Sequence, residues 1–108
     1  MFEFSQTADH GMRIALRTKS FEAGNLPEFN CGLAKHCPRE LREVEIDFSG
    51  VEMIDSSGIG ALLSVHKRLK GDGARVSLNN VQPAVVSVIE LLRLHQVFDI
   101  AVAEEISA

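Results

Sequence analysis

Residues 44–63, VEIDFSGVEMIDSSGIGALL, contain the change from strand to helix that decides the fold of this chain. The first five residues alternate apolar and acidic side chains, the period-two pattern of a half-buried strand. Asp55, Ser56, Ser57 and Gly58 are residue types that precede or begin helices. Apolar or partly apolar side chains then recur at helical spacing, at Ile59, Leu62, Leu63, His66 and Leu69. The stretch therefore predicts a strand, a short connection and a helix over residues 57–70.

The residues before this stretch predict a hairpin and a first helix. Residues 2–7 are strand-like, and residues 12–17 alternate apolar and basic side chains. The turn residues 9–11 separate them, so we expect an antiparallel hairpin. Asn25 can cap a helix over residues 25–37, whose first turn suits Pro27.

The residues after this stretch complete an alternating pattern. Residues 75–79 predict a strand, 80–82 a loop, 83–95 a helix and 97–102 a last strand. The order β-β-α-β-α-β-α-β predicts an α/β fold with a mixed four- to five-stranded sheet. A length of 108 residues suits one domain, so we assign residues 1–108 to it. The helix residues expected to be buried are Ile59, Leu62, Leu63, Ile89 and Leu92.

Composition limits the class of function. The chain is 45% apolar and carries a formal net charge of −4, with 11 basic and 15 acidic residues. This balance lacks the basic footprint of a nucleic-acid binder. No apolar run reaches membrane-spanning length and no signal-peptide pattern opens the chain, so we expect a cytoplasmic protein without nucleic-acid or membrane partners. We expect Cys31 and Cys37 to be buried or half-buried free thiols.

Asp55, Ser56 and Ser57 stand where the strand gives way to the helix. The first N–H groups of a helix have no intrahelical partner, and the macrodipole adds partial positive charge, so this position accepts an added anion. One serine could cap the helix while the other stays free for a protein kinase. Capping alone is the simpler interpretation, and the residues leave both open. Gly58 and Gly60 leave the helix start without bulky cover.

The enzymatic motifs that this stretch approaches are incomplete. Leu63 occupies the third glycine position of a dinucleotide fingerprint, and the Gly-Lys-Ser/Thr of a Walker loop is absent. A nucleophile elbow would need glycine where Ile54 or Asp55 stands. The four histidines lack metal-ligand spacing. We therefore expect no catalytic residue, no metal site and no cofactor.

Residues 44–63, with the order of elements around them, resemble the core signature of STAS domains, and more narrowly of bacterial anti-sigma factor antagonists. The later pattern is similar as well, at residues 71–73, 83–85 and 97–98. The resemblance covers residues 12–100 and is specific in 44–63. It implies a single STAS domain without catalytic activity.

The resemblance also implies a switch. In such a family, the unphosphorylated antagonist binds an anti-sigma factor that is a GHKL-type serine kinase, and this binding releases the sigma factor. The kinase phosphorylates the serine after the motif aspartate, here Ser56, and a PP2C-type phosphatase reverses the modification. Phe21 could anchor the partner or belong to the core, and the core is favoured. The implied partner surface comprises Glu22, Gly24, Asn25, Asp55, Ser56, Ser57, Gly58 and Gly60.

One departure from the family pattern bears on the partner. The family often has Gly-x-Leu-Asp after the second strand, whereas this chain has Lys19-Ser20-Phe21-Glu22. The runner-up function is a STAS subunit of an ABC-type lipid-transport complex. Such subunits typically carry Thr-Gly where this chain has Ser56-Ser57, so the serine pair favours the antagonist.

Overall fold

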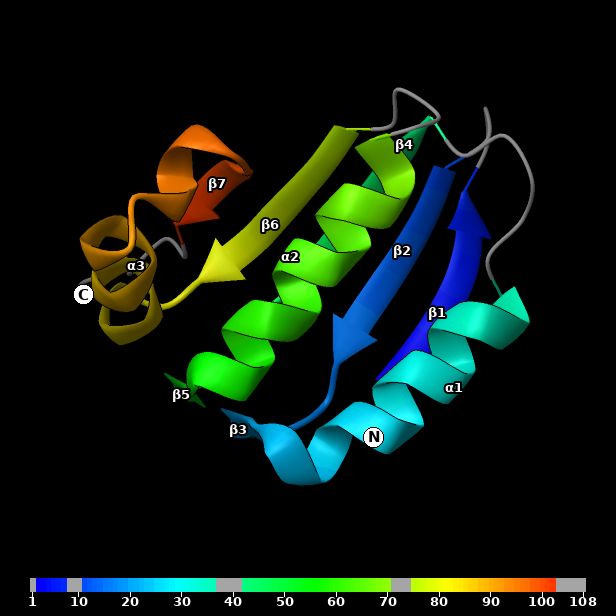
Figure 1. The fold of residues 1–108 in the computed structure, drawn as a ribbon, viewed down its shortest axis with the longest axis horizontal. Coiled ribbons are helices and arrows are strands. Elements are labelled where there is room, and N and C mark those ends of the chain that lie inside the picture. The colour runs from blue at the N-terminus through cyan, green and yellow to red at the C-terminus, as the bar shows by residue number, and fades with distance from the viewer. Residues whose placement is uncertain (1, 8–10, 37–41, 71–74, 103–108) are drawn as a thin grey trace, which may run out of the picture.

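Five strands form one mixed sheet in the computed structural model, which describes residues 2–7, 11–36, 42–70 and 75–102. The strand order is β1-β2-β4-β6-β7 (Figure 1). Strand β1 (Phe2–Thr7) pairs antiparallel with β2 (Gly11–Leu16), which confirms the predicted hairpin. Strands β4 (Glu43–Asp47), β6 (Arg75–Val81) and β7 (Asp99–Val102) continue the sheet in parallel. The predicted α/β fold with a mixed sheet is confirmed.

Three α-helices connect the parallel strands. They are α1 (Leu26–His36), α2 (Ser56–Lys70) and α3 (Pro83–Leu91), with 3-10 turns η1 (Ala23–Asn25) and η2 (Leu94–Gln96). Helices α1 and α2 lie across the same face of the sheet, and α3 lies beside the end of β6 (Figure 1). Each follows a parallel strand and precedes the next, because parallel strands need a crossover connection. The start of α2 therefore lies at the carboxyl ends of β2, β4 and β6.

The core lies between the sheet and its helices. Alternate residues of β2 and β4 point into this core and are fully buried, among them Ile14, Val44 and Ile46. Their neighbours on the opposite face are polar except for Ala15, and there Arg13 and Asp47 form an ion pair at 3.5 Å. This alternation is what the period-two pattern of these strands predicts. Burying one large apolar side chain stabilises the fold by roughly 1.5–3 kcal/mol. The fully buried large side chains are Met12, Ile14, Phe21, Phe29, Val44, Ile46, Phe48, Val51, Leu62, Leu78 and Ile89.

A second, two-stranded ladder was not expected from the sequence. Strand β3 (Ser20–Phe21) pairs in parallel with β5 (Met53–Ile54), so the structure has two more strands than the predicted order. Two residues are too few to show a strand period, which explains why the pattern missed them. Phe21 is fully buried, so the preference for the core over a partner anchor is confirmed.

Three predicted boundaries near the C-terminus were wrong. Helix α3 ends at Leu91 rather than about residue 95, because Arg93 adopts a left-handed backbone with φ of 59°. Strand β6 runs on to Val81, through the expected loop. Strand β7 begins at Asp99 rather than residue 97, because η2 and the turn after it occupy the preceding residues. Residues 9 and 10 of the predicted hairpin turn, Cys37, residues 71–73 and residues 103–108 lie outside the described residues, while Gly11 is the first residue of β2.

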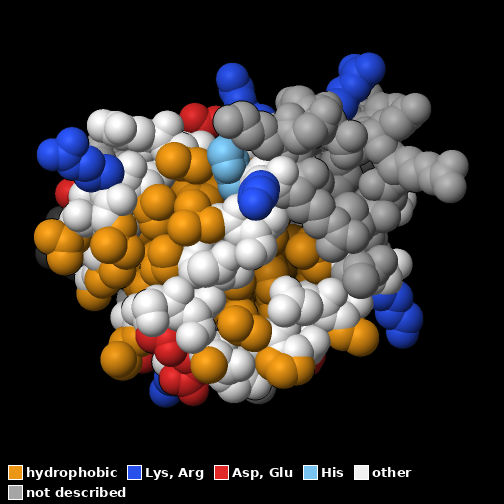
Figure 2. Space-filling view, in the orientation of Figure 1, with side chains coloured by type: hydrophobic (Ala, Val, Ile, Leu, Met, Phe, Trp, Pro, Cys, Tyr) orange, Lys and Arg blue, Asp and Glu red, His pale blue; other side chains and the backbone are white. Residues whose placement is uncertain are grey.

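Some burial predictions were also wrong. Ile59, Leu62 and Ile89 are buried as expected, but Leu63 is 39% exposed and Leu92 is 51% exposed. Helix α2 buries a narrower stripe than its apolar residues suggested, and Leu92 lies just beyond the end of α3. Cys31 is an exposed free thiol, contrary to expectation. Figure 2 shows apolar side chains gathered on this face over α2 and α3.

Candidate functional site

The two loops predicted to form one surface are joined by the β3–β5 ladder. The carbonyl of Lys19 accepts hydrogen bonds from the backbone N–H groups of Glu52 and Met53, at 2.7 and 3.0 Å. The carbonyl of Phe21 accepts a longer one from Asp55, at 3.4 Å. The loop after β2 therefore lies directly against the entry to α2, and the structure brings the two predicted groups of residues together.

Asp55, and neither serine, caps helix α2. Its carboxylate Oδ1 accepts a hydrogen bond from the N–H of Gly58 at 2.9 Å, and its carbonyl accepts one from Ile59 at 3.0 Å. This is the geometry of an N-cap residue. This corrects the interpretation in which the hydroxyl of one serine caps the helix. Ser56 is the exposed first residue of α2, and Ser57 is half-buried.

Ser56 lies where an anion is accommodated at low cost. Within the described part of the chain its hydroxyl makes no hydrogen bond, and it lies at the positive end of a 15-residue helix. Unpaired N–H groups and the macrodipole stabilise negative charge at such an end. The hydroxyl is therefore chemically free to receive a phosphoryl group.

Gly58 and Gly60 differ in what surrounds them. A Cβ at Gly58 would meet the carbonyl oxygen of Phe21 at 2.3 Å and the side chain of Ile54 at 2.8 Å. A Cβ at Gly60 would meet nothing within 4 Å. Gly58 thus lets the first turn of α2 rest on the backbone of β3, whereas Gly60 leaves open surface beside Ser56.

The loop over residues 18–25 is held by its own polar side chains. The amide nitrogen of Asn25 donates to the carbonyl of Ser20 and to the Thr18 hydroxyl. Asn25 therefore fixes the loop instead of capping α1, which corrects the predicted cap. The hydroxyl of Ser20 donates to the carboxylate of Glu22 at 3.2 Å. Gly24 is exposed, and a Cβ there would meet nothing within 4 Å.

The site is acidic. Glu22, Glu52 and Asp55 are all exposed on the two joined loops. Figure 2 shows acidic side chains gathered at the lower edge of the face, near where Figure 1 places the start of α2.

One exposed stripe of α2 leads away from Ser56. Residues 56, 60 and 63 follow one another at helical spacings of four and three, so they share one side of the helix. Ser56 and Leu63 are about 10.5 Å apart along the axis at 1.5 Å per residue. Gly60 leaves that space uncovered, and all three positions are exposed. Sequence reasoning missed Leu63 as a surface residue because its helical spacing also fits the core.

Asp47, at the end of β4, belongs to a structural network. Burial alone would raise the pKa of Asp47, but hydrogen bonds from Asn80 and Ser49 and the charge of Arg13 together lower it. Its Oδ1 accepts hydrogen bonds from the Asn80 amide at 3.1 Å and from the Ser49 N–H at 3.0 Å.

Among the described residues, no group of three or more His, Cys, Asp or Glu side chains could hold a metal ion. In the same residues, every helix is too short or too polar to cross a membrane.

The sequence model of the STAS domain matches residues 13–106 of this chain. The chain belongs to the STAS domain family. A comparison with curated proteins found no match.

Solved STAS structures are similar over nearly the whole chain. An anti-sigma-factor antagonist (STAS) domain protein from Planctomyces limnophilus has 21% identity and a TM-score of 0.83, over 95% of this chain and 91% of its own. The anti-sigma factor antagonist SpoIIAA in its unphosphorylated form has 18% identity and a TM-score of 0.76, over 94% and 88%. A murine solute carrier 26 anion transporter has 18% identity and a TM-score of 0.75, over 93% of this chain but 17% of the transporter. At these identities the likenesses establish the STAS fold, which antagonists and a transporter share.

Proposed function

We propose that this STAS domain is an anti-sigma factor antagonist that is switched by phosphorylation of Ser56. In the unphosphorylated state it binds a GHKL-type anti-sigma factor serine kinase in the cytoplasm, and the sigma factor is released. The kinase transfers a phosphoryl group to Ser56 and the complex separates. A PP2C-type phosphatase restores the binding state. The domain itself supplies a surface and an acceptor hydroxyl, and it catalyses no reaction.

The free hydroxyl of Ser56 carries this proposal. Asp55 caps α2, so phosphorylation of Ser56 removes no contact on which the helix depends. The N-terminus of α2 stabilises the added charge, and the fold should accept the phosphate without melting. Two of the similar solved structures are SpoIIAA in unphosphorylated and phosphorylated forms, which supports a fold that tolerates this modification.

The phosphate would act at the interface and leave the fold intact. Phosphorylation adds roughly 1.5 to 2 negative charges at pH 7, at a position where the kinase binds a neutral hydroxyl. The phosphate is taken out of water in the complex alone, and an unpaired charge buried in this way costs several kcal/mol, here on the order of 4 kcal/mol. Such a cost lowers affinity nearly a thousandfold, roughly 1.4 kcal/mol per factor of ten, and releases a micromolar partner.

The proposed partner surface comprises the loop residues predicted from the sequence together with the exposed stripe of α2. Glu22, Gly24 and Asn25 contribute one loop, and residues 55–60 contribute the other. Gly58 is buried, so its part is to hold the two loops close together. Leu63 adds an apolar contact about 10.5 Å along the helix from Ser56, and an apolar anchor surrounded by polar groups is a common interface design.

Phosphopeptide mapping after incubation with the cognate kinase and ATP tests the acceptor. Label is expected on Ser56 in the natural protein and in the Ser57→Ala variant, and is lost in Ser56→Ala. The Ser56→Ala variant should stay bound to the kinase in the presence of ATP, while Ser56→Asp should bind weakly with an unchanged circular dichroism spectrum. Label on Ser57 alone, or on neither serine, would overturn the assignment.

Substitutions at open glycines test the surface. Both Gly24 and Gly60 face open space, so Gly24→Phe and Gly60→Phe should fold and yet weaken kinase binding at least tenfold. Leu63→Ala should weaken binding and leave stability nearly unchanged, while Leu91→Ala, at a residue 82% exposed on α3, is the matched control. If both glycine variants bind like the natural protein, the surface lies elsewhere. Affinity capture that returns an ABC-type ATPase in place of a GHKL-type kinase would favour the lipid-transport alternative.

A further inference from the structure

Two residues at the carboxyl end of β6 and just after it depart from local conformational preferences. Asn80 lies within β6 with a left-handed backbone, at φ of 55°, where the register of the strand shifts. Gln82 occupies the N-cap position of α3, but its side chain makes no capping hydrogen bond. Strands seldom contain a left-handed residue, and Ser, Thr, Asp or Asn is preferred at an N-cap. Such departures persist where surrounding contacts require them.

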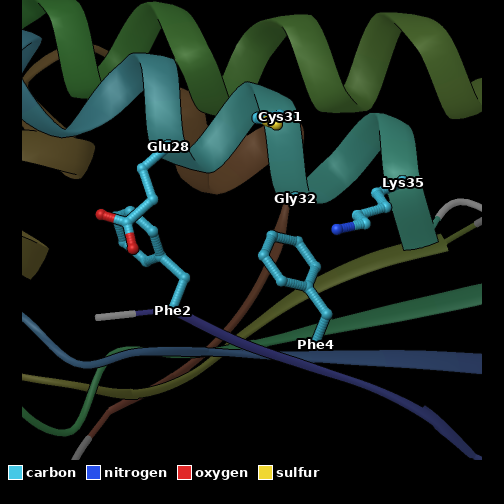
Figure 3. Close-up of a pocket in the computed structure, with 6 residues that line it drawn as sticks. All are labelled: Phe2, Phe4, Glu28, Cys31, Gly32 and Lys35. Carbon is cyan, nitrogen blue, oxygen red and sulfur yellow. The ribbon is translucent and has the colours of Figure 1, made fainter.

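A departure elsewhere in the fold has a packing cause. Gly32 lies in the middle of α1, where glycine weakens a helix. Figure 3 shows the ring of Phe4 beneath this turn of the helix, and a Cβ on Gly32 would collide with that ring. By contrast, Asn80 is exposed and Gln82 is half-buried, so packing in the core does not explain their conformations.

The side chains of Asn80 and Gln82 both hold the connection that leads from β4 to β5. The amide of Asn80 donates a hydrogen bond to Oδ1 of Asp47 at 3.1 Å, and the same oxygen accepts one from the N–H of Ser49 at 3.0 Å. The amide of Gln82 donates to the carbonyl of Ser49 at 3.0 Å. These two amide side chains therefore form a hook that fixes Ser49 through its N–H and its carbonyl.

The connection held by the hook ends at the phosphoacceptor. After Ser49 the chain makes a tight turn, in which the N–H of Val51 donates to the carbonyl of Phe48 at 2.9 Å. The chain then enters β5, which pairs with β3 and leads directly into Asp55 and Ser56. Figure 1 places β5 between β3 and α3, so the ladder fixes the connection on one side and the hook fixes it on the other.

We propose that Asn80 and Gln82 are positioning residues for the phosphoacceptor Ser56, a role that rests on the proposed function. The hook acts on Ser56 through the connection and leaves its hydroxyl to the kinase. The left-handed backbone of Asn80 accompanies its bond to Asp47, and Gln82 forgoes the α3 cap for its bond to the carbonyl of Ser49. Two residues that forgo local stability for the same loop are expected where the position of that loop matters for binding.

Opposite charges at position 82 separate this role from a contribution to stability. Gln82→Glu keeps the shape but can only accept hydrogen bonds, so it loses the bond to Ser49, while its negative charge suits the N-terminus of α3. Gln82→Lys keeps a donor for that carbonyl, but its positive charge opposes the helix dipole. The midpoint of thermal unfolding should therefore stay near the natural value in the first variant and fall slightly in the second. Ala84→Glu, at an exposed position in the first turn of α3, is the matched charge control.

Phosphorylation by the kinase that the natural chain captures should follow the hydrogen bond and not the thermal midpoint. In Gln82→Glu the KM for the domain should rise roughly twofold to tenfold, the worth of one hydrogen bond. Its kcat should be unchanged, because the kinase selects the ordered connection and holds it once bound. Gln82→Lys and Ala84→Glu should keep the natural KM. A KM that follows the thermal midpoint, or that stays unchanged in Gln82→Glu, would overturn the proposal.

Amide hydrogen exchange of the free domain gives a readout that needs no kinase. The N–H groups of Glu52 and Met53, which bond to β3, should exchange roughly twofold to tenfold faster in Gln82→Glu. Asn80→Gly keeps the left-handed backbone, removes the amide and should have the same effect, whereas Ala84→Glu should have none. Unchanged exchange in both hook variants would contradict the proposal. A natural domain that the kinase does not phosphorylate would refute the proposed function and this role with it, while normal phosphorylation with an unchanged KM in Gln82→Glu would refute this role alone.

Discussion

Replacing Gly58 by alanine should destabilise the fold, whereas the same change at Gly60 should stabilise it. The two glycines lie two residues apart in the first turns of α2. The same substitution is therefore compared at two positions of one helix. Alanine favours a helix over glycine by about 1 kcal/mol, and Gly60 has open space for the methyl group, so Gly60→Ala should gain about that much.

At Gly58 the same gain is outweighed by a collision. The added Cβ would lie 2.3 Å from the Phe21 carbonyl oxygen, over 1 Å closer than the 3.4 Å at which ordinary contact begins. Overpacking of this kind costs typically about 1–3 kcal/mol, and a backbone carbonyl in the β3–β5 ladder yields less than a side chain would. With the collision at the upper end, about 3 kcal/mol, and the helix gain of about 1 kcal/mol subtracted, a net loss of about 2 kcal/mol is expected, and the midpoint of thermal unfolding should fall by roughly 8–16 °C. Gly60→Ala should raise it by roughly 4–8 °C.

Thermal and urea unfolding followed by circular dichroism measure both changes on the same day and in the same buffer. The urea slope should be unaltered in both variants, because the surface exposed on unfolding stays the same. If Gly58→Ala is as stable as the natural protein, the contact between α2 and β3 is not close. If Gly60→Ala is destabilised, that position is not open. Either result would refute the reasoning from the two glycine environments.

The remaining predictions concern single side chains. Asp55→Ala should lower the free energy of unfolding by about 1 kcal/mol through the lost cap, while Ser57→Ala should change it very little. Urea unfolding compares the two variants, and equal losses would contradict the assignment of the cap. Arg93→Gly should stabilise the fold by about 1 kcal/mol in thermal unfolding, because glycine adopts the left-handed backbone that Arg93 occupies without its steric cost; a loss would show that the arginine side chain matters there. The pKa of Asp47 is lowered in the folded state, so its contribution is fully present above the unfolded pKa near 4 and is lost as pH falls through the folded value. Asp47→Asn should therefore flatten the decline of stability below about pH 5 in acid titrations of unfolding, and an unchanged decline would place the effect in other carboxylates.

The sequence predicts the parts of the fold that have many residues and a regular period. The alternation in residues 44–48 and in β2 is strong because each strand has one buried and one polar face. Ser20–Phe21 and Met53–Ile54 have no such signal, since a ladder of two residues exists only when the rest of the fold brings its halves together. The contact between the two candidate loops therefore needed the structure, even though the resemblance had placed them on one surface.

The sequence predicts only in part which residues cap and end the helices. Asp55, Ser56 and Ser57 can all cap a helix, and which one does depends on where the first helical residue falls. Arg93 gives no hint that it leaves the helix, because the left-handed conformation at this point is normally marked by glycine or asparagine. For the same reason the pattern predicts Leu92 as a core residue, although α3 ends one residue earlier and Leu92 is 51% exposed.

The division of labour at the start of α2 has an evolutionary consequence. Because Asp55 alone supplies the cap, selection for a stable helix acts on that residue and leaves position 56 free to serve the proposed switch. A lineage can exchange either serine for another small residue, and so lose or alter a response, without first acquiring a compensating change in the core. Adjacent residues on one turn are therefore open to separate selection, and the proposed acceptor can be replaced without a change in the scaffold that carries it.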